Sequence, residues 1–190
     1  DNLVSSITKY KDRLKYISFD RIKNELNIIF RHNKASNAFE LINGLKLDKV
    51  LKISHKNMII DCDNYIGVWA QVLYSDDYNF SKKEMNEISI IKSIIEKGYI
   101  DDYMLYKYDF NIIRTSSLVL NLDIDYKTIY NNLPIHNRKD IDIDVYDIMK
   151  LTSKENIDKI YVDLEKQILY NKLKNEKSIL IEYIMNNYRN

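Results

Sequence analysis

The stretch SKKEMNEISIIKSIIEKG, Ser81–Gly98, decides the fold class because it contains a complete helix with both ends marked. Ser81 and Glu84 have the spacing of a capping box, in which each side chain accepts a hydrogen bond from a backbone amide that the helix start leaves unpaired. Apolar side chains then recur every three or four residues, at Met85, Ile88, Ile91 and Ile95. Gly98 follows where a helix end favours left-handed backbone. We therefore predict an amphipathic helix between Ser81 and Gly98.

The same helical period runs through most of the chain. It predicts further helices around residues 3–14, 19–30, 38–45, 62–73, 103–108, 112–120, 126–133, 157–168 and 175–184. Ser18 and Asn175 stand where two of these helices need an N-terminal cap. Only DIDIDV, Asp140–Val145, alternates with period two, and a strand of that length is too short for an independent sheet. The sequence predicts an all-α fold, with Pro134, the sole proline, as the best internal boundary.

Composition narrows the class of protein. With 3 glycines and 1 proline in 190 residues, a turn-dense β-sandwich or barrel is disfavoured. The net charge of +1 gives no overall field that would attract nucleic acid, so such binding would depend on local patches. Cys62 is the only cysteine, which excludes a disulfide framework and fits a reducing cytosol. The chain starts at Asp1 and not at a methionine, and we expect a piece of a longer protein.

The segment KDIDIDVYDIM, Lys139–Met149, has the paired carboxylates that metal sites use. Its four aspartates are Asp140, Asp142, Asp144 and Asp147. A calcium loop that starts at Asp140 would need glycine and glutamate where Val145 and Leu151 stand. A two-metal site would need a glycine-rich substrate loop, which three scattered glycines do not supply. We expect no metal here, but a solvated polar face with Ile141, Ile143 and Val145 turned inward.

Other catalytic patterns are missing as well. His32, His55 and His136 form no His-Asp doublet and have no spacing that places two ligands on one helix face. Cys62 lies on an apolar stripe, where a packed thiol is expected. Most of the 16 tyrosines are expected in core or boundary positions. Basic residues cluster in four places, at Lys9–Lys15, Arg31–Lys34, Ser81–Lys83 and His136–Lys139.

Four segments, in order, resemble blocks of the superfamily of CCA-adding tRNA nucleotidyltransferases and poly(A) polymerases. They are LKYISFDRIKNELNIIF (14–30), ASNAFELINGLKLDKVL (35–51), LPIHNRKDIDIDVYDIM (133–149) and KLKNEKSILIEYI (172–184). In the first, Ile17, Ser18, Arg21, Ile22, Glu25 and Leu26 match the family's pattern. In the third, Asp144-Val145 replaces the family's Asn-Gly, so the turn there is expected to differ.

The resemblance implies a C-terminal part of such an enzyme. The family's Gly-Gly loop, the D-x-D metal pair that its head carries on a β-sheet and its E-D-x-x-R element are not found in the chain, and the D-x-D spacing of Asp140–Asp144 only mimics that metal pair. The implied architecture is an elongated multi-helix array without the catalytic α/β head. Residues 1–55 would be the remainder of the neck, 56–132 a helical body and 133–190 a helical tail. No catalytic residue, metal ligand or cofactor site is expected in this part, and Mg²⁺ would belong to the missing head.

The resemblance also implies a function. This part would grip the acceptor stem and elbow of tRNA while the head of the same chain adds nucleotides from CTP and ATP, and it would be inactive alone. Lys82, Lys83, Arg138 and Lys139 are the expected contacts to the RNA backbone, and Arg21 and Glu25 an ion pair within the neck. A cytoplasmic protein without a membrane span is expected, of open oligomeric state. The alternatives are a C-terminal part of a poly(A) polymerase and an all-α protein–protein interaction module.

Overall fold

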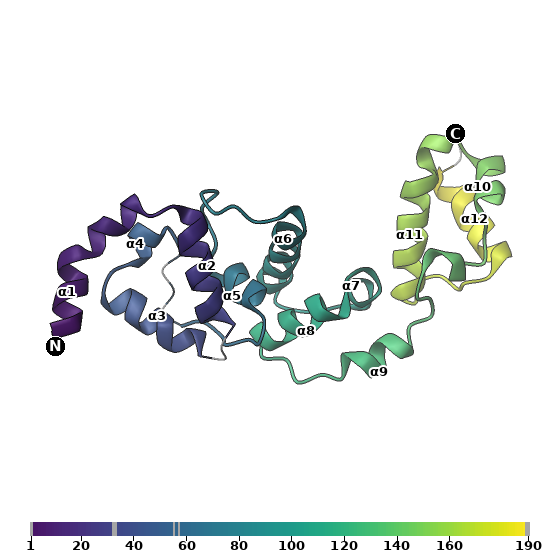
Figure 1. The fold of residues 1–190 in the computed structure, drawn as a ribbon. Coiled ribbons are helices and arrows are strands. Elements are labelled where there is room, and N and C mark those ends of the chain that lie inside the picture. The colour runs from purple at the N-terminus through teal and green to yellow at the C-terminus, as the bar shows by residue number, and fades with distance from the viewer. Residues whose placement is uncertain (1, 32–33, 55, 57, 189–190) are drawn as a thin grey trace. The chain divides into compact units, whose positions relative to one another are not determined.

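The computed structural model describes residues 2–31, 34–54, 56 and 58–188. These residues form twelve α-helices and three 3-10 helices, and no β-strand occurs among them (Figure 1). The predicted all-α fold is thereby confirmed. The chain divides into two compact units. The first contains Asp1–Tyr99 and Asn111–Asp123, and the second contains Ile100–Phe110 and Ile124–Asn190. The neck, body and tail boundaries stay a prediction.

The first unit contains most of the N-terminal helices. They are α1 (Asn2–Tyr10), η1 (Lys11–Tyr16), α2 (Phe19–Phe30), α3 (Ala35–Gly44), α4 (Asp48–Leu51), α5 (Tyr65–Val72), α6 (Lys82–Lys97) and most of α8 (Phe110–Val119). Within this unit α5 packs against α6, and α2 packs against both α3 and α5. The first predicted helix is interrupted, because the backbone changes from α to 3-10 geometry at Lys11.

The predicted helix ends of α2 and α6 are confirmed. The Ser18 hydroxyl accepts a hydrogen bond from the Arg21 amide at the start of α2, at 3.4 Å. At the start of α6, Ser81 and Glu84 form the reciprocal capping box, with bonds of 3.2 and 2.8 Å. Gly98 ends α6 with a φ of 77°, a left-handed conformation that glycine adopts without strain.

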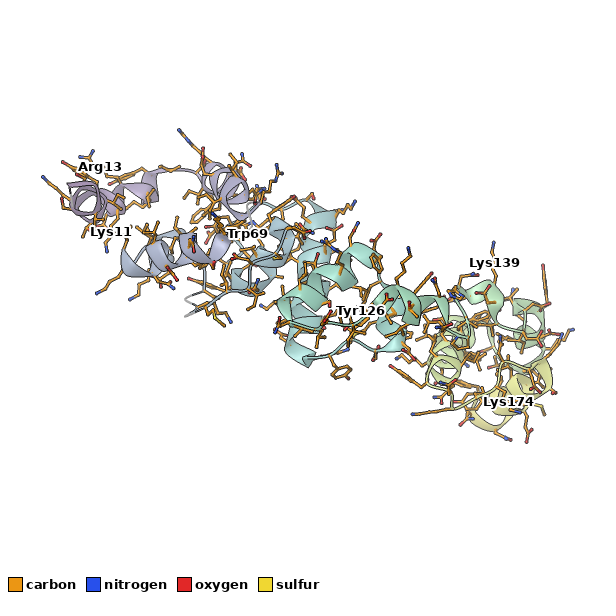
Figure 2. The ribbon with its side chains drawn as sticks, turned by 90° about the horizontal axis from the view of Figure 1, so that it is seen from below. Lys11, Arg13, Trp69, Tyr126, Lys139 and Lys174 are labelled. Carbon is orange, nitrogen blue, oxygen red and sulfur yellow. The ribbon has the colours of Figure 1, made fainter. Side chains whose placement is uncertain are left out.

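Trp69 is the centre of the first unit's core (Figure 2). Its side chain is completely buried. The rings of Phe30, Tyr78 and Phe80 lie 5.2, 4.8 and 5.2 Å from its own, at the inclined angles that aromatic quadrupoles favour. The indole nitrogen donates to the Asn27 amide oxygen at 2.7 Å, which satisfies its only polar group. This aromatic cluster joins α2, α5 and the loop before α6.

Some apolar residues of α2 and α3 face the solvent and not the core. Ile22, Leu26 and Phe30 form the buried face of α2, whereas Ile29 is 41% exposed. In α3, Leu41 is 64% exposed, because the core side of that helix contains other residues. They are Ala35, Phe39 and Ile42. Neighbouring apolar residues on one helix cannot all face the core, and packing selects among them.

The second unit is built around a long helix. Its elements are α7 (Asp102–Lys107), α9 (Tyr126–Asn131), η2 (Arg138–Asp140), α10 (Val145–Leu151), η3 (Lys154–Asn156), α11 (Ile157–Leu169) and α12 (Lys177–Tyr188). Helix α11 packs against α7, α10 and α12. Its buried side is lined mainly by apolar residues, at Ile160, Tyr161, Leu164, Ile168 and Leu169, with the polar Glu165 among them.

The period-two segment Asp140–Val145 does not form a strand. It leaves η2 at Asp140, passes through a short extended stretch and enters α10, whose N-cap is Asp144. Ile141 and Ile143 are buried as predicted, but Val145 is 37% exposed and its predicted inward orientation is wrong. The period changes from 2 to 3.6 at Asp144, so the next buried residue is Ile148.

Candidate nucleic-acid interface

The four aspartates of Lys139–Met149 hold the second unit together. Asp140 accepts the backbone amides of His136 and Asn137 at 2.7 and 3.1 Å, and the bond from His136 contributes most to lowering the pKa of its carboxyl. Asp144 accepts the amide of Asp147 at 2.8 Å, which caps α10. These carboxylates are therefore satisfied by backbone donors, as helix-capping residues are.

The other two aspartates bind the start of α12. Asp142 accepts the amide of Lys177 at 3.0 Å, and Asp147 forms an ion pair of 2.5 Å with the Lys177 ammonium group. That ammonium group is the main cause of the lowered pKa of Asp147. Among the described residues, no group of three or more His, Cys, Asp and Glu side chains is arranged to hold a metal ion.

Asn175 acts on this same loop. Its side-chain oxygen accepts the Asp142 amide at 2.8 Å, and its side-chain nitrogen donates to the Asp140 carbonyl at 2.7 Å. We predicted Asn175 as the cap of the last helix, but these two side-chain bonds fix the loop 140–142 instead. The amide of Lys177, at the start of α12, is bonded by Asp142 from a distant part of the chain.

A depression of about 680 Å³ opens beside these residues. Its apolar lining includes Ile141, Ile143 and Tyr161, and its rim contains both signs of charge. The basic residues are Arg138, Lys139 and Lys177, and the acidic ones are Asp142, Asp144 and Asp147. With equal numbers of the two charges around it, the depression does not favour an anion such as a phosphate.

Arg138, a predicted RNA contact, is engaged inside the protein. Its guanidinium group bonds Glu165 at 3.1 Å and Asp158 at 2.9 Å, and it lies 4.8 Å from the centre of the Tyr161 ring. Glu165 is buried, so this pair links η2 to α11. Two carboxylates neutralise the charge of Arg138, which favours a structural role over a phosphate contact.

Lys139, by contrast, is exposed (Figure 2). Its backbone amide donates to the Asn137 side chain at 2.9 Å, and among the described residues no carboxylate lies within 4.0 Å of its ammonium group. Lys174, also exposed, lies on a different side of the same unit (Figure 2). Of the two basic residues predicted in this segment, only Lys139 has a side chain available for an external anion.

Lys82 and Lys83 are the first two residues of α6 and both are exposed. Lys83 contacts Glu87 at 3.9 Å, a distance at which an exposed pair contributes little. The positive end of a 16-residue helix lies beside both ammonium groups. This is an arrangement that can hold a phosphate through charge. Lys82 and Lys83 belong to the first unit, and Lys139 belongs to the second.

The predicted pair Arg21 and Glu25 lies on α2. Both residues line a shallow pocket of about 280 Å³ together with Leu14, Ile17, Ile22, Leu26 and Leu51. Among the described contacts, no ion pair within 4.0 Å joins their side chains. The pair stays a prediction, and the Arg21 backbone amide donates to the Ser18 hydroxyl.

The basic cluster at Lys9–Lys15 is not among the predicted contacts to RNA. In the structure, Lys9 and Arg13 approach the Tyr10 ring at 5.3 and 4.5 Å, and Lys15 approaches the Tyr16 ring at 5.1 Å. The alternation of cations and tyrosines in KYKDRLKY was the signal that could have identified it.

Of the remaining candidate residues, His136 and Cys62 have structural roles, and the other two lie outside the described residues. The Nε2 of His136 contacts the Tyr130 carbonyl at 2.9 Å. Burial raises the pKa of the Cys62 thiol to about 11, so Cys62 is a packed thiol as predicted. His32 and His55 are outside the described residues. Within the described ranges, no helix combines the length and apolar character needed to cross a membrane.

Comparison with known proteins gives one informative similarity. No family model matches the chain. The chain is 29% identical over 115 residues to a CCA-adding enzyme of Staphylococcus haemolyticus (strain JCSC1435), an alignment that covers 59% of this chain. The chain spans about a quarter of the length of that relative, since the alignment covers 26% of it. The similarity supports a relation to tRNA nucleotidyltransferases, the superfamily that the four sequence blocks resemble.

Proposed function

We propose that this chain is the tRNA-binding helical region of a tRNA nucleotidyltransferase. The observation that carries the proposal is the 29% identity to a CCA-adding enzyme, a member of the superfamily that the four sequence blocks also resemble. CCA addition would be catalysed by a head outside the chain, where Mg²⁺ is expected. This chain would supply binding and orientation of the tRNA.

The RNA contacts that we propose are exposed lysines in each of the two units, and not a catalytic pocket. Lys82 and Lys83 at the start of α6, and Lys139 within η2, have exposed side chains. Side chains cannot enter the deep major groove of an A-form duplex, so tRNA stems are held through phosphates and ribose. Arg138 would act indirectly, because its bonds to Glu165 and Asp158 orient the segment that presents Lys139.

A salt-titrated binding measurement with labelled tRNA tests the proposal. We expect log Kd to rise linearly with log salt concentration, because each phosphate contact releases condensed counterions. The triple variant Lys82→Gln, Lys83→Gln, Lys139→Gln is expected to bind more weakly and to lower the salt slope by about 1 for each lysine that contacts a phosphate.

The matched control removes three other exposed lysines, Lys92, Lys127 and Lys154, and changes the net charge by the same amount. It should bind tRNA as the parent chain does. Absence of tRNA binding at low salt would refute the proposal for this chain. Equal losses in both triple variants would show that net charge, and not these three residues, determines binding.

A further inference from the structure

A second surface in the first unit has the chemistry to bind RNA in a different way. We call Lys9–Tyr16, at the end of α1 and along η1, the basic-aromatic segment. It contains four cations and two tyrosines, and Asp12 is its only carboxylate. None of the residues proposed above for the tRNA contact belongs to it.

The 3-10 geometry of η1 sorts these side chains into rows. In a 3-10 helix the side chains at i and i+3 are eclipsed, so Lys11 lies in line with Leu14, and Arg13 in line with Tyr16. The first row faces the protein: Leu14 lines the pocket beside α2, and the Lys11 ammonium group donates to the Leu45 carbonyl at 3.3 Å. The side chains of Lys11 and Arg13 point to different sides of the segment (Figure 2).

The outer side therefore presents cations and aromatic rings together. Tyr16 is 80% exposed and Tyr10 45% exposed, although both are large apolar rings. The Arg13 guanidinium group lies 4.5 Å from the centre of the Tyr10 ring, and the Lys15 ammonium group 5.1 Å from the centre of the Tyr16 ring. An exposed ring beside a cation can hold a base against its face while the cation meets the adjacent phosphate.

We propose that the basic-aromatic segment binds an unpaired stretch of RNA, with Tyr16 stacking on a base and Lys9, Arg13 and Lys15 contacting phosphates. This inference rests on the proposed function, since it adds a single-strand site to an RNA-binding chain. Insertion into a membrane surface would require a broad, continuous apolar face. The outer rows offer none, because Leu14, the aliphatic residue of η1, points inward.

The experiment uses the full chain, a labelled twelve-nucleotide oligouridine and a blunt RNA duplex of equal length. We expect Tyr16→Ala to weaken oligouridine binding about 5- to 100-fold, the loss typical of one stacked base. Tyr16→Phe keeps the ring and should bind within twofold of the parent chain. Binding of the blunt duplex should not respond to either change, because paired bases have no free face.

The cations are tested in the variant Lys9→Gln, Arg13→Gln, Lys15→Gln. The salt slope for oligouridine should fall by about 2, from three contacts at about 0.7 each. The control variant at Lys92, Lys127 and Lys154 should keep the parent slope. Equal oligouridine binding by Tyr16→Ala and the parent chain would overturn the inference. So would equal losses for oligouridine and duplex, or binding of the segment to anionic phosphatidylserine vesicles in place of RNA.

The two proposals fail in different ways. If the parent chain binds tRNA, and the variant at Lys82, Lys83 and Lys139 binds it more weakly with a lower salt slope, the proposed function holds whatever Tyr16→Ala does. If oligouridine binding is insensitive to Tyr16 while tRNA binding persists, only the inference about the basic-aromatic segment is wrong. If neither RNA binds, both are wrong.

Discussion

At the scale of single residues, Arg138 stabilises the second unit through ion pairs with two carboxylates of α11, those of Asp158 and Glu165. Its partner Glu165 has a side chain only 7% exposed, and the Tyr106 hydroxyl also bonds Glu165. Burial and these contacts raise the pKa of Tyr106, since ionising a phenol beside a buried carboxylate is unfavourable. A buried carboxylate without its cation would be strongly destabilising.

We predict that Arg138→Ala lowers the free energy of unfolding by about 2 to 3 kcal/mol. This is near the low end for breaking a buried ion pair, because the Arg138 side chain is 42% exposed. Adding Glu165→Gln to Arg138→Ala should recover part of the loss, since the uncompensated charge is then removed. Urea unfolding followed by circular dichroism measures both effects.

Lys139→Ala is the control and should change stability by less than about 0.5 kcal/mol, as exposed substitutions do. An Arg138→Ala chain of unchanged stability and weakened tRNA binding would contradict the structural role. It would support the sequence-based assignment of Arg138 as an RNA contact.

At the scale of elements, close helix packing in the first unit depends on Gly67 in α5. A Cβ atom at this position would lie 2.5 Å from Cγ2 of Thr115 in α8 and 2.8 Å from Sγ of Cys62. Both neighbours are buried, so neither can move freely into solvent. Here glycine is required for the approach of α5 to its neighbours and not for a special backbone conformation.

Gly67→Ala should therefore destabilise the protein by about 1 to 2 kcal/mol, although alanine is the better helix former by about 1 kcal/mol. Thr115→Ser removes Cγ2 and should recover part of that loss. The control is Gly44→Ala at the end of α3, where a Cβ meets nothing within 4 Å. That change should leave stability equal or raise it by up to about 1 kcal/mol. Thermal unfolding of these three variants, namely Gly67→Ala, Gly67→Ala with Thr115→Ser, and Gly44→Ala, distinguishes these outcomes.

Helices α11 and α12 are joined by Asp163. Its carboxylate accepts the hydroxyls of Tyr183 and Tyr188, each at 2.8 Å. Burial alone would raise the pKa of Asp163, but these bonds and one from Gln167 outweigh it and lower the pKa. Burial, with the bond to Asp163, raises the pKa of Tyr183 and of Tyr188 to about 12.

The raised tyrosine pKa values predict an alkaline weakness. An unfolded chain loses these protons near pH 10 and the folded chain near pH 12, so their stabilising contribution is complete below pH 10 and is lost as the pH rises to 12. The double variant Tyr183→Phe, Tyr188→Phe should be less stable than the parent chain at pH 8. It should also lose less stability than the parent chain between pH 10 and pH 12. Urea unfolding across this range measures it, and parallel pH curves for the two proteins would contradict the prediction.

On the scale of the whole molecule, the chain consists of two compact units, each with its own buried core. Trp69, the single tryptophan, lies in the core of the first unit, so its fluorescence reports on that unit. Helical circular dichroism reports on both units. Because each unit buries its own apolar residues, we treat them as separate units of stability.

If the two units are separate units of stability, a substitution that destabilises the second unit should shift the circular dichroism transition but not the Trp69 fluorescence transition. Arg138→Ala should move the circular dichroism transition in urea while the Trp69 fluorescence transition stays at the parent midpoint. Gly67→Ala, in the first unit, should move the fluorescence transition. Coincident shifts of both signals in both variants would show that the two units unfold as one.

Local signals in the sequence were enough for several features. The helical period predicted the all-α fold, and Ser18, Ser81, Glu84 and Gly98 were identified as helix ends. A cap depends on residues at most three or four positions apart, so its partners can be read from their spacing alone. The exclusion of a calcium loop at Asp140–Leu151 followed from residue types at fixed positions.

Other features depend on which residues meet from distant parts of the chain. The sequence near Arg138 contains no sign of Glu165, 27 positions away, so Arg138 was assigned to RNA. Asp142 and Asn175 are 33 positions apart, and only folding brings the amide of one to the side chain of the other. Whether a charged side chain is free for a ligand or bound within the protein is decided by packing, because local spacing determines helices but not their partners.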